Sequence, residues 1–139
     1  MNASVLLRIA AVFILLFGVG HSLGYPWVGN VTEAQQTALM DAIQANTAVT
    51  MGFMRSYADF HVGFGWFISI FFLVQAIVVW RLASLLGAQP AVVKFLSGLF
   101  AVQYLATLVL DYYFFFWAPI ISAALVAACF LAVYLNIEA

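Results

Sequence analysis

Long apolar runs alternate with short polar stretches along this chain. Four of the runs are long enough to cross a bilayer, and they cover about residues 4–23, 60–80, 92–111 and 119–136. A spanning helix needs about 20 mostly apolar residues to cross a hydrocarbon core of roughly 30 Å. Short connections join antiparallel neighbours. The pattern therefore predicts an all-α, integral membrane, antiparallel four-helix bundle that forms one domain over residues 1–139.

The longest connection carries a helix signal of its own. Thr32-Glu33-Ala34-Gln35 fits a capping box. After it, Ala38, Ala42, Ala45 and Val49 recur on one helical face, and polar residues fill the rest of the wheel. We expect a short amphipathic helix in the first extracytoplasmic loop, at the bundle ends or the lipid interface. Asn30-Val31-Thr32 also has the spacing of a glycosylation acceptor.

The composition supports a polytopic membrane protein and excludes several other classes. Hydrophobic residues make up 68% of the chain and charged residues 6%. The single cysteine, Cys129, rules out an intrachain disulfide and dithiol exchange. A net charge of −1 without a basic stripe disfavours nucleic acid as a partner. The lipid bilayer is the partner that this composition implies.

The few cations predict an orientation. Arg8, Arg81 and Lys94 flank one side of the membrane, whereas Arg55 is on the other. Because Lys and Arg gather in short cytoplasmic loops, both termini are expected in the cytoplasm. Aromatic residues agree with the outer boundary, where amphipathic rings favour the headgroup level; they are Tyr25, Trp27, Tyr57, Tyr112, Tyr113 and Trp117.

The other ionisable residues gather at one level. His21 lies near the outer end of the first run, Arg55, Asp59 and His61 lie around the start of the second, and Asp111 closes the third. An ionisable side chain at membrane depth is costly and is a functional candidate by default. If the chain has a site, the sequence predicts that it opens outward.

Helical periodicity sorts the same residues by face. Arg55 and Asp59 are four apart and are expected to pair on one face of the second helix. His61 points elsewhere, about 200° from Asp59 on an ideal helix. Tyr104, Thr107 and Asp111 form one stripe of the third helix, which we expect to face the interior.

The favoured hypothesis is a polar pocket at the outer face that binds a lipid, a quinone or another small apolar ligand by its headgroup. The protein would then be an accessory or binding subunit. Its expected lining is His21, Arg55, Asp59, His61, Asp111, Tyr104 and Thr107.

Two enzyme hypotheses use the histidines, and the sequence leaves open whether the protein is an enzyme. His21 and His61, with Asp59 or Asp111, would be a sufficient ligand set for a divalent metal such as zinc. Alternatively, the two histidines lie on different helices at similar depth, as axial ligands of a b-type haem do.

A third hypothesis is structural. The polar residues would then satisfy helix ends, and the chain would be a subunit of a larger membrane complex or a homo-oligomer. Ala124, Ala128 and Ala132 repeat every fourth residue in the last helix, and such small-residue ridges let helices approach closely in lipid.

A family resemblance supports the fold. Arg8, Phe13 and Phe17, followed by Gly18 and Gly20, resemble the first helix of DoxX-like membrane proteins. Residues 20–24 and 55–65 also look like a group of small, uncharacterised four-helix bacterial membrane proteins. The resemblance implies a four-helix protein of the bacterial inner membrane, with a link to respiratory or thiosulfate–quinone chemistry. The lysine that this family often carries near the position of His21, and the acid within its second helix, are absent here.

Overall fold

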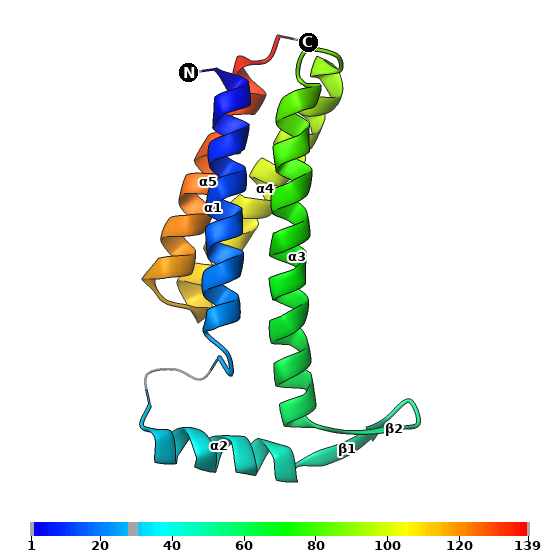
Figure 1. Cartoon of the computed structure of the whole chain (residues 1–139), viewed down its shortest axis with the longest axis vertical. Helices are drawn as coiled ribbons and strands as arrows, with labels where there is room; N and C mark the ends of the chain where they lie inside the picture. The colour runs from blue at the N-terminus through cyan, green and yellow to red at the C-terminus, as the bar shows by residue number, and fades with distance from the viewer. Residues whose placement is uncertain (1, 28–30, 139) are drawn as a thin grey trace. The chain divides into compact units, whose positions relative to one another are not determined.

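The computed structural model describes residues 2–27 and 31–138. Four long apolar helices pack antiparallel, as predicted, and a short helix and a β-hairpin lie between the first and the next long helix in the chain (Figure 1). The long helices are α1 (Ala3–Leu23), α3 (Tyr57–Leu85), α4 (Pro90–Phe114) and α5 (Trp117–Asn136). The connecting elements are α2 (Glu33–Ala45), β1 (Thr47–Thr50) and β2 (Phe53–Ser56).

All four long helices have the length and hydropathy of membrane spans, so the chain is a polytopic integral membrane protein with four candidate spans. Each helix includes its predicted run and extends beyond it by up to a few residues at one or both ends. The extension is greatest in α3, whose 29 residues make a helix of about 43 Å at 1.5 Å per residue. A hydrocarbon core is thinner than this, so the ends of α3 extend beyond it. The apolar run alone therefore underestimates the length of α3.

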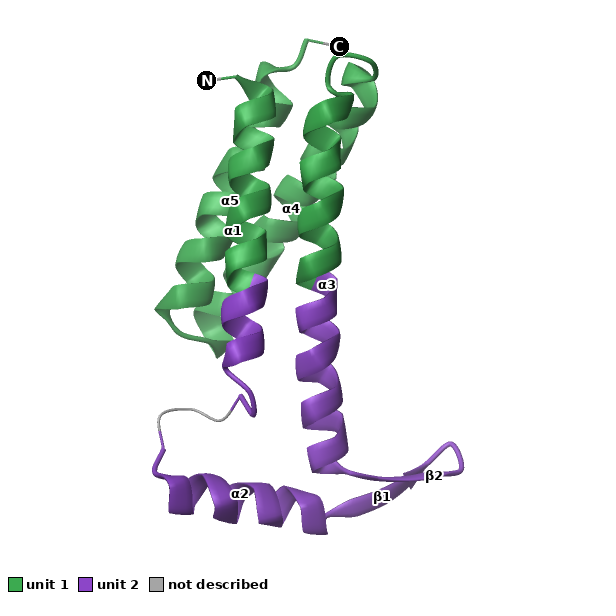
Figure 2. Ribbon diagram, viewed as in Figure 1, with its two compact units in different colours: residues 1–17, 72–139 green, residues 18–71 purple. Residues whose placement is uncertain are grey.

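The chain forms two compact units (Figure 2). Unit 1 comprises residues 1–17 and 72–139, and unit 2 comprises residues 18–71. In unit 1, parts of α1 and α3 pack with α4 and α5 around an apolar core. Its largest fully buried apolar side chains are Leu7, Ile14, Val79, Val93, Val126, Phe130 and Val133.

The α4–α5 contact in unit 1 depends on a glycine. A Cβ atom placed on Gly98 would lie 3.0 Å from Cδ2 of Tyr134, which is closer than ordinary van der Waals contact. Lys94 lies one turn earlier on α4, and its Nζ is 5.7 Å from the centroid of the same ring. The small residue therefore lets the two helices approach, as in other lipid-embedded bundles.

Three cations gather at the end of unit 1 that also carries both termini (Figure 1). The Arg8 guanidinium lies 5.3 Å from the centroid of the Trp80 ring, and Lys94 lies over Tyr134 as described. Arg81 is in the last turns of α3. The grouping on which the orientation argument depends is therefore present in the folded unit.

In unit 2, the capping box that starts α2 is present as predicted. The Gln35 side chain accepts a hydrogen bond of 3.0 Å from the backbone N–H of Thr32, and Thr32 Oγ1 accepts one of 3.3 Å from the Gln35 N–H. Each side chain satisfies a backbone group that the helix leaves unpaired. Asn30, the acceptor of the glycosylation motif, lies outside the described residues.

The predicted continuation of this helix to Val49 is wrong. The helix ends at Ala45, and Val49 lies in β1, which pairs antiparallel with β2. Met51 and Gly52 connect the strands with φ of 50° and 84°. Two positive φ values in a two-residue loop are the mark of a type I′ hairpin turn, and glycine is suited to it.

Candidate functional site

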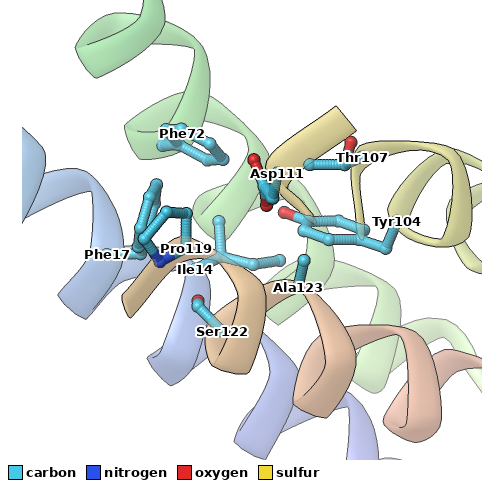
Figure 3. Close-up of a pocket in the computed structure, with 9 residues that line it drawn as sticks. All are labelled: Ile14, Phe17, Phe72, Tyr104, Thr107, Asp111, Pro119, Ser122 and Ala123. Carbon is cyan, nitrogen blue, oxygen red and sulfur yellow. The ribbon is translucent and has the colours of Figure 1, made fainter. Parts of the chain in front are cut away.

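Unit 1 contains a small cavity of about 40 Å³ (Figure 3). Its polar lining comes from α4 and α5, and apolar side chains from α1, α3 and α5 close it. The polar residues are Tyr104, Thr107, Asp111 and Ser122, and the apolar ones are Ile14, Phe17, Phe72, Pro119 and Ala123.

Asp111 is the unusual residue of this cavity. Its side chain is 7% exposed, and within residues 2–27 and 31–138 its carboxylate makes no hydrogen bond and no ion pair. Burial of a polar group without a partner costs free energy, and the cost is higher for a charge. Within the described residues, the fold itself does not supply a partner for this carboxylate.

The stripe on α4 is arranged as the helical periodicity predicts. Tyr104, Thr107 and Asp111 all line the cavity, and the first and last are buried. Figure 3 shows the Tyr104 hydroxyl directed toward the Asp111 carboxylate. Three of the predicted site residues are therefore brought together.

The hydrogen bonds around Tyr104 show where its hydroxyl proton points. Its hydroxyl donates to Gln75 Oε1 at 2.7 Å, and Gln75 Nε2 donates to Gln103 Oε1 at 3.2 Å. The Tyr104 oxygen is thus left as an acceptor on the cavity side. Sequence reasoning missed Gln75 and Ser122, although both are isolated polar residues in apolar helices, and that isolation was the available signal.

An apolar groove of about 220 Å³ lies beside this cavity. It lies on the side of unit 1 formed by α1 and α5, and it shares Phe17 and Ser122 with the cavity lining. Its other lining residues are Phe13, Leu16, Ala118, Ile121 and Leu125. Polar residues are four of the nine that line the cavity and one of the seven that line the groove.

The histidines are in unit 2, where both bind the segment that follows α1. His21 Nδ1 lies 3.1 Å from Ser69 Oγ. His61 Nε2 donates to the Pro26 carbonyl at 2.7 Å, since a carbonyl oxygen only accepts. The Trp27 indole N–H donates to the His21 carbonyl at 2.7 Å. These bonds hold the last turn of α1, residues 25–27 and α3 together within the unit.

Trp27 is the centre of this arrangement. Its ring stacks on His21 with centroids 5.3 Å apart, meets His61 edge-on at 6.2 Å and meets Trp66 edge-on at 5.6 Å. Gly65 makes the contact possible, because a Cβ there would collide with the Trp27 six-membered ring. We call these five residues the Trp27 cluster.

The contacts of His21 and His61 can be compared with those that a haem or a metal ion would need. Nε2 of His61 is bonded to the Pro26 carbonyl and would have to leave it to bind a haem iron. The contact of His21 Nδ1 with Ser69 does not argue against ligation, because a ligating histidine commonly hydrogen-bonds through its other ring nitrogen. Among the described residues, no group of three or more His, Cys, Asp or Glu side chains is placed to hold a metal ion.

Arg55 and Asp59 have other roles than the predicted helical pair. The two do not share a helical face, because α3 begins at Tyr57 and Arg55 lies in β2. The Arg55 charge still acts on the Asp59 carboxylate through space. The Arg55 guanidinium donates to the Met54 carbonyl at 2.9 Å and lies 5.5 Å from the Phe53 ring centroid.

Asp59 instead caps the start of α3. Its Oδ2 accepts a hydrogen bond of 2.8 Å from the Ser56 backbone N–H, and the Asp59 N–H donates to Ser56 Oγ at 3.1 Å. This is a reciprocal cap with Asp in place of the usual Glu or Gln. The Ser-x-x-Asp spacing was its signal in the sequence.

The fold and the cavity define an integral membrane protein with four candidate spans and a small polar site. Comparison of the chain with models of known families, with curated proteins and with solved structures found no match.

Proposed function

We propose that the protein binds a small, single-chain apolar molecule, such as a lipid, by seating its polar head in the Asp111 cavity and its chain in the adjoining groove. It would act as a binding or accessory subunit. The observation that carries the proposal is the buried Asp111 carboxylate, which has no partner among the described residues and lines a cavity. Lipid makes such a group costly unless function requires it.

The dimensions of the cavity limit the head of this ligand. The polar cavity measures about 40 Å³, whereas an apolar cavity that holds benzene measures about 150 Å³. A head of a few atoms therefore fits beside Asp111, and a quinone ring does not. The ring of a quinone would have to lie in the groove of about 220 Å³.

The orientation of the site is part of the proposal. Arg8, Arg81 and Lys94 favour cytoplasmic termini, so the cavity, near the far end of α4, would open in the outer half of the membrane. A bacterial inner membrane location and DoxX-like membership are proposals that rest on the sequence resemblance alone.

The test is photo-crosslinking in lipid nanodiscs with hexadecanol that carries a diazirine in mid-chain. We expect the crosslinks to concentrate on the groove residues, around Phe13 to Phe17 and Ala118 to Leu125. Ala118→Phe fills the groove and should reduce labelling there. Ala128→Phe is the matched control, because Ala128 is an exposed alanine of the same helix that does not line the groove.

Labelling spread evenly over the lipid-facing surfaces of the four long helices, and equal in both variants, would refute the proposal. Such a result would favour the purely structural subunit.

A further inference from the structure

We infer that the head bound beside Asp111 is a primary ammonium group, so that the ligand is a single-chain amine. This inference rests on the proposed function and specifies its ligand class. The balance of donors and acceptors, the charge and the size of the cavity all favour this head.

The cavity has more hydrogen-bond acceptors than donors. Asp111 contributes two carboxylate oxygens, and neither is occupied by a partner in the described part of the chain. The Tyr104 oxygen can only accept there, because its proton is committed to Gln75 at 2.7 Å. The hydroxyls of Thr107 and Ser122 can take either role. A head with several N–H donors complements this lining, and an ammonium group has three.

The charge of the lining favours the same head. No Lys, Arg or His side chain is among the residues that line the cavity, all of which belong to the described part of unit 1. A carboxylate or phosphate head would meet Asp111 with like charge. An ammonium head would give the buried carboxylate a counter-charge and charge-assisted hydrogen bonds.

The dimensions allow such a ligand and disfavour bulkier amines. About 40 Å³ accommodates an –NH₃⁺ group with its adjacent methylene, but a trimethylated head would exceed it. The groove that shares Phe17 and Ser122 is apolar and suits the attached chain.

The experiment is isothermal titration calorimetry on the full chain in nanodiscs of neutral lipid, with empty nanodiscs subtracted. The probes are hexylamine, hexan-1-ol, hexanoate, methylammonium and sodium. We expect hexylamine to bind most tightly and Asp111→Asn to weaken it by about 10- to 100-fold, the range for loss of a hydrogen bond to a charged group. Asn keeps the shape of the side chain and removes its charge. Asp41→Asn, on exposed α2, is the matched control and should bind hexylamine like the wild type.

The other outcomes distinguish failure of the amine inference from failure of the proposed function. Hexanol binding that exceeds hexylamine binding, or hexylamine binding unchanged by Asp111→Asn, would overturn the amine while leaving a ligand pocket in place. Methylammonium or sodium binding as tightly as hexylamine would show a free cation site without a chain, and would also overturn it. If no hexyl compound binds and the crosslinking of hexadecanol is also evenly spread, the proposed function itself fails.

Loss of binding in a variant is meaningful only if the variant still folds. Asp111→Asn should keep the elution volume and the helical circular dichroism of the wild type. Thr107→Val provides a second variant, since it removes one hydroxyl from the lining and keeps the branched shape. We expect it to weaken hexylamine about threefold to tenfold, the effect of one neutral hydrogen bond. Unchanged hexylamine affinity in Thr107→Val would contradict the donor–acceptor argument.

Discussion

Substitution of Gly65 by alanine should open the Trp27 cluster. A Cβ at this position would occupy the space of the Trp27 six-membered ring, and three ring carbons would be too close to it. The ring must therefore move away from α3. Gly63, half a turn earlier on the same helix, has nothing within 4 Å of the equivalent Cβ position. The two glycines form a matched pair, and only one of them should respond.

The contacts of Trp27 give the magnitude. Its displacement would break the hydrogen bond of 2.7 Å to the His21 carbonyl, worth about 1 kcal/mol. It would also separate the ring from His21 and Trp66, at about 0.5–1.5 kcal/mol for each aromatic pair. The preference of alanine over glycine in a helix does not enter, because α3 is helical whether the cluster is closed or open. The closed cluster should thus lose at least about 2 kcal/mol in Gly65→Ala, and Gly63→Ala should lose nothing.

Hydrogen exchange of the indole N–H of Trp27 measures this opening directly. The chain has four tryptophans, so four indole signals are expected in an ¹⁵N spectrum, and Trp27→Phe assigns the relevant one. About 2 kcal/mol corresponds to roughly 30-fold faster exchange if exchange requires opening. Equal exchange rates in the wild type, Gly65→Ala and Gly63→Ala would refute the close packing of Trp27 against α3.

Three further predictions concern unit 1 and the orientation. Asp111→Leu should raise the free energy of unfolding by about 1–3 kcal/mol, because it removes a buried polar group without a partner, and thermal unfolding in detergent should show this together with loss of hexylamine binding; a lower melting temperature would contradict it. Ser97→Ala should stabilise the protein by about 1 kcal/mol in the same assay, since the Ser97 hydroxyl is fully buried and has no hydrogen-bond partner within residues 2–27 and 31–138; a destabilised variant would contradict this. In a Cys129→Ser background, a membrane-impermeant maleimide applied to intact cells should label Thr37→Cys and spare Ala88→Cys until lysis, and the reverse pattern would invert the orientation.

Much of the fold is predictable from this sequence because lipid imposes a simple constraint on it. Backbone groups in hydrocarbon must pair within a helix, so long apolar runs determine where helices lie. The capping box at Thr32 was equally predictable, since its side-chain bonds are local. Both features depend on neighbours in the sequence.

The hairpin and the start of α3 were harder to predict. A run from Ala38 to Val49 keeps helical periodicity in its apolar residues, yet a type I′ turn at Met51-Gly52 pairs Val49 with Met54. Periodicity does not weigh a turn against one more helical turn when the segment is short. The prediction for Arg55 failed for the same reason, because the strand reaches Ser56 before α3 begins.

The site was predictable in part. The stripe of Tyr104, Thr107 and Asp111 follows from spacing on one helix, and the structure keeps it on one cavity. Ser122 belongs to another helix, and no pattern within α5 relates it to Asp111. The Trp27 cluster was missed because its interactions involve a loop, residues 25–27, whose conformation periodicity does not describe.

The distinction between a structural and a functional polar residue lies in its partners, not in its chemical type. Asp59 is occupied by the cap of α3, and His61 is occupied by a backbone carbonyl. The fold itself supplies partners for both groups, of which Asp59 is exposed and His61 half-buried. Asp111 has no such compensation in the described chain, although a cavity adjoins it. A carboxylate that the fold leaves unpaired beside a cavity lowers the free energy of unfolding. Replacement of Asp111, rather than of either histidine, should therefore stabilise the protein and remove ligand binding together.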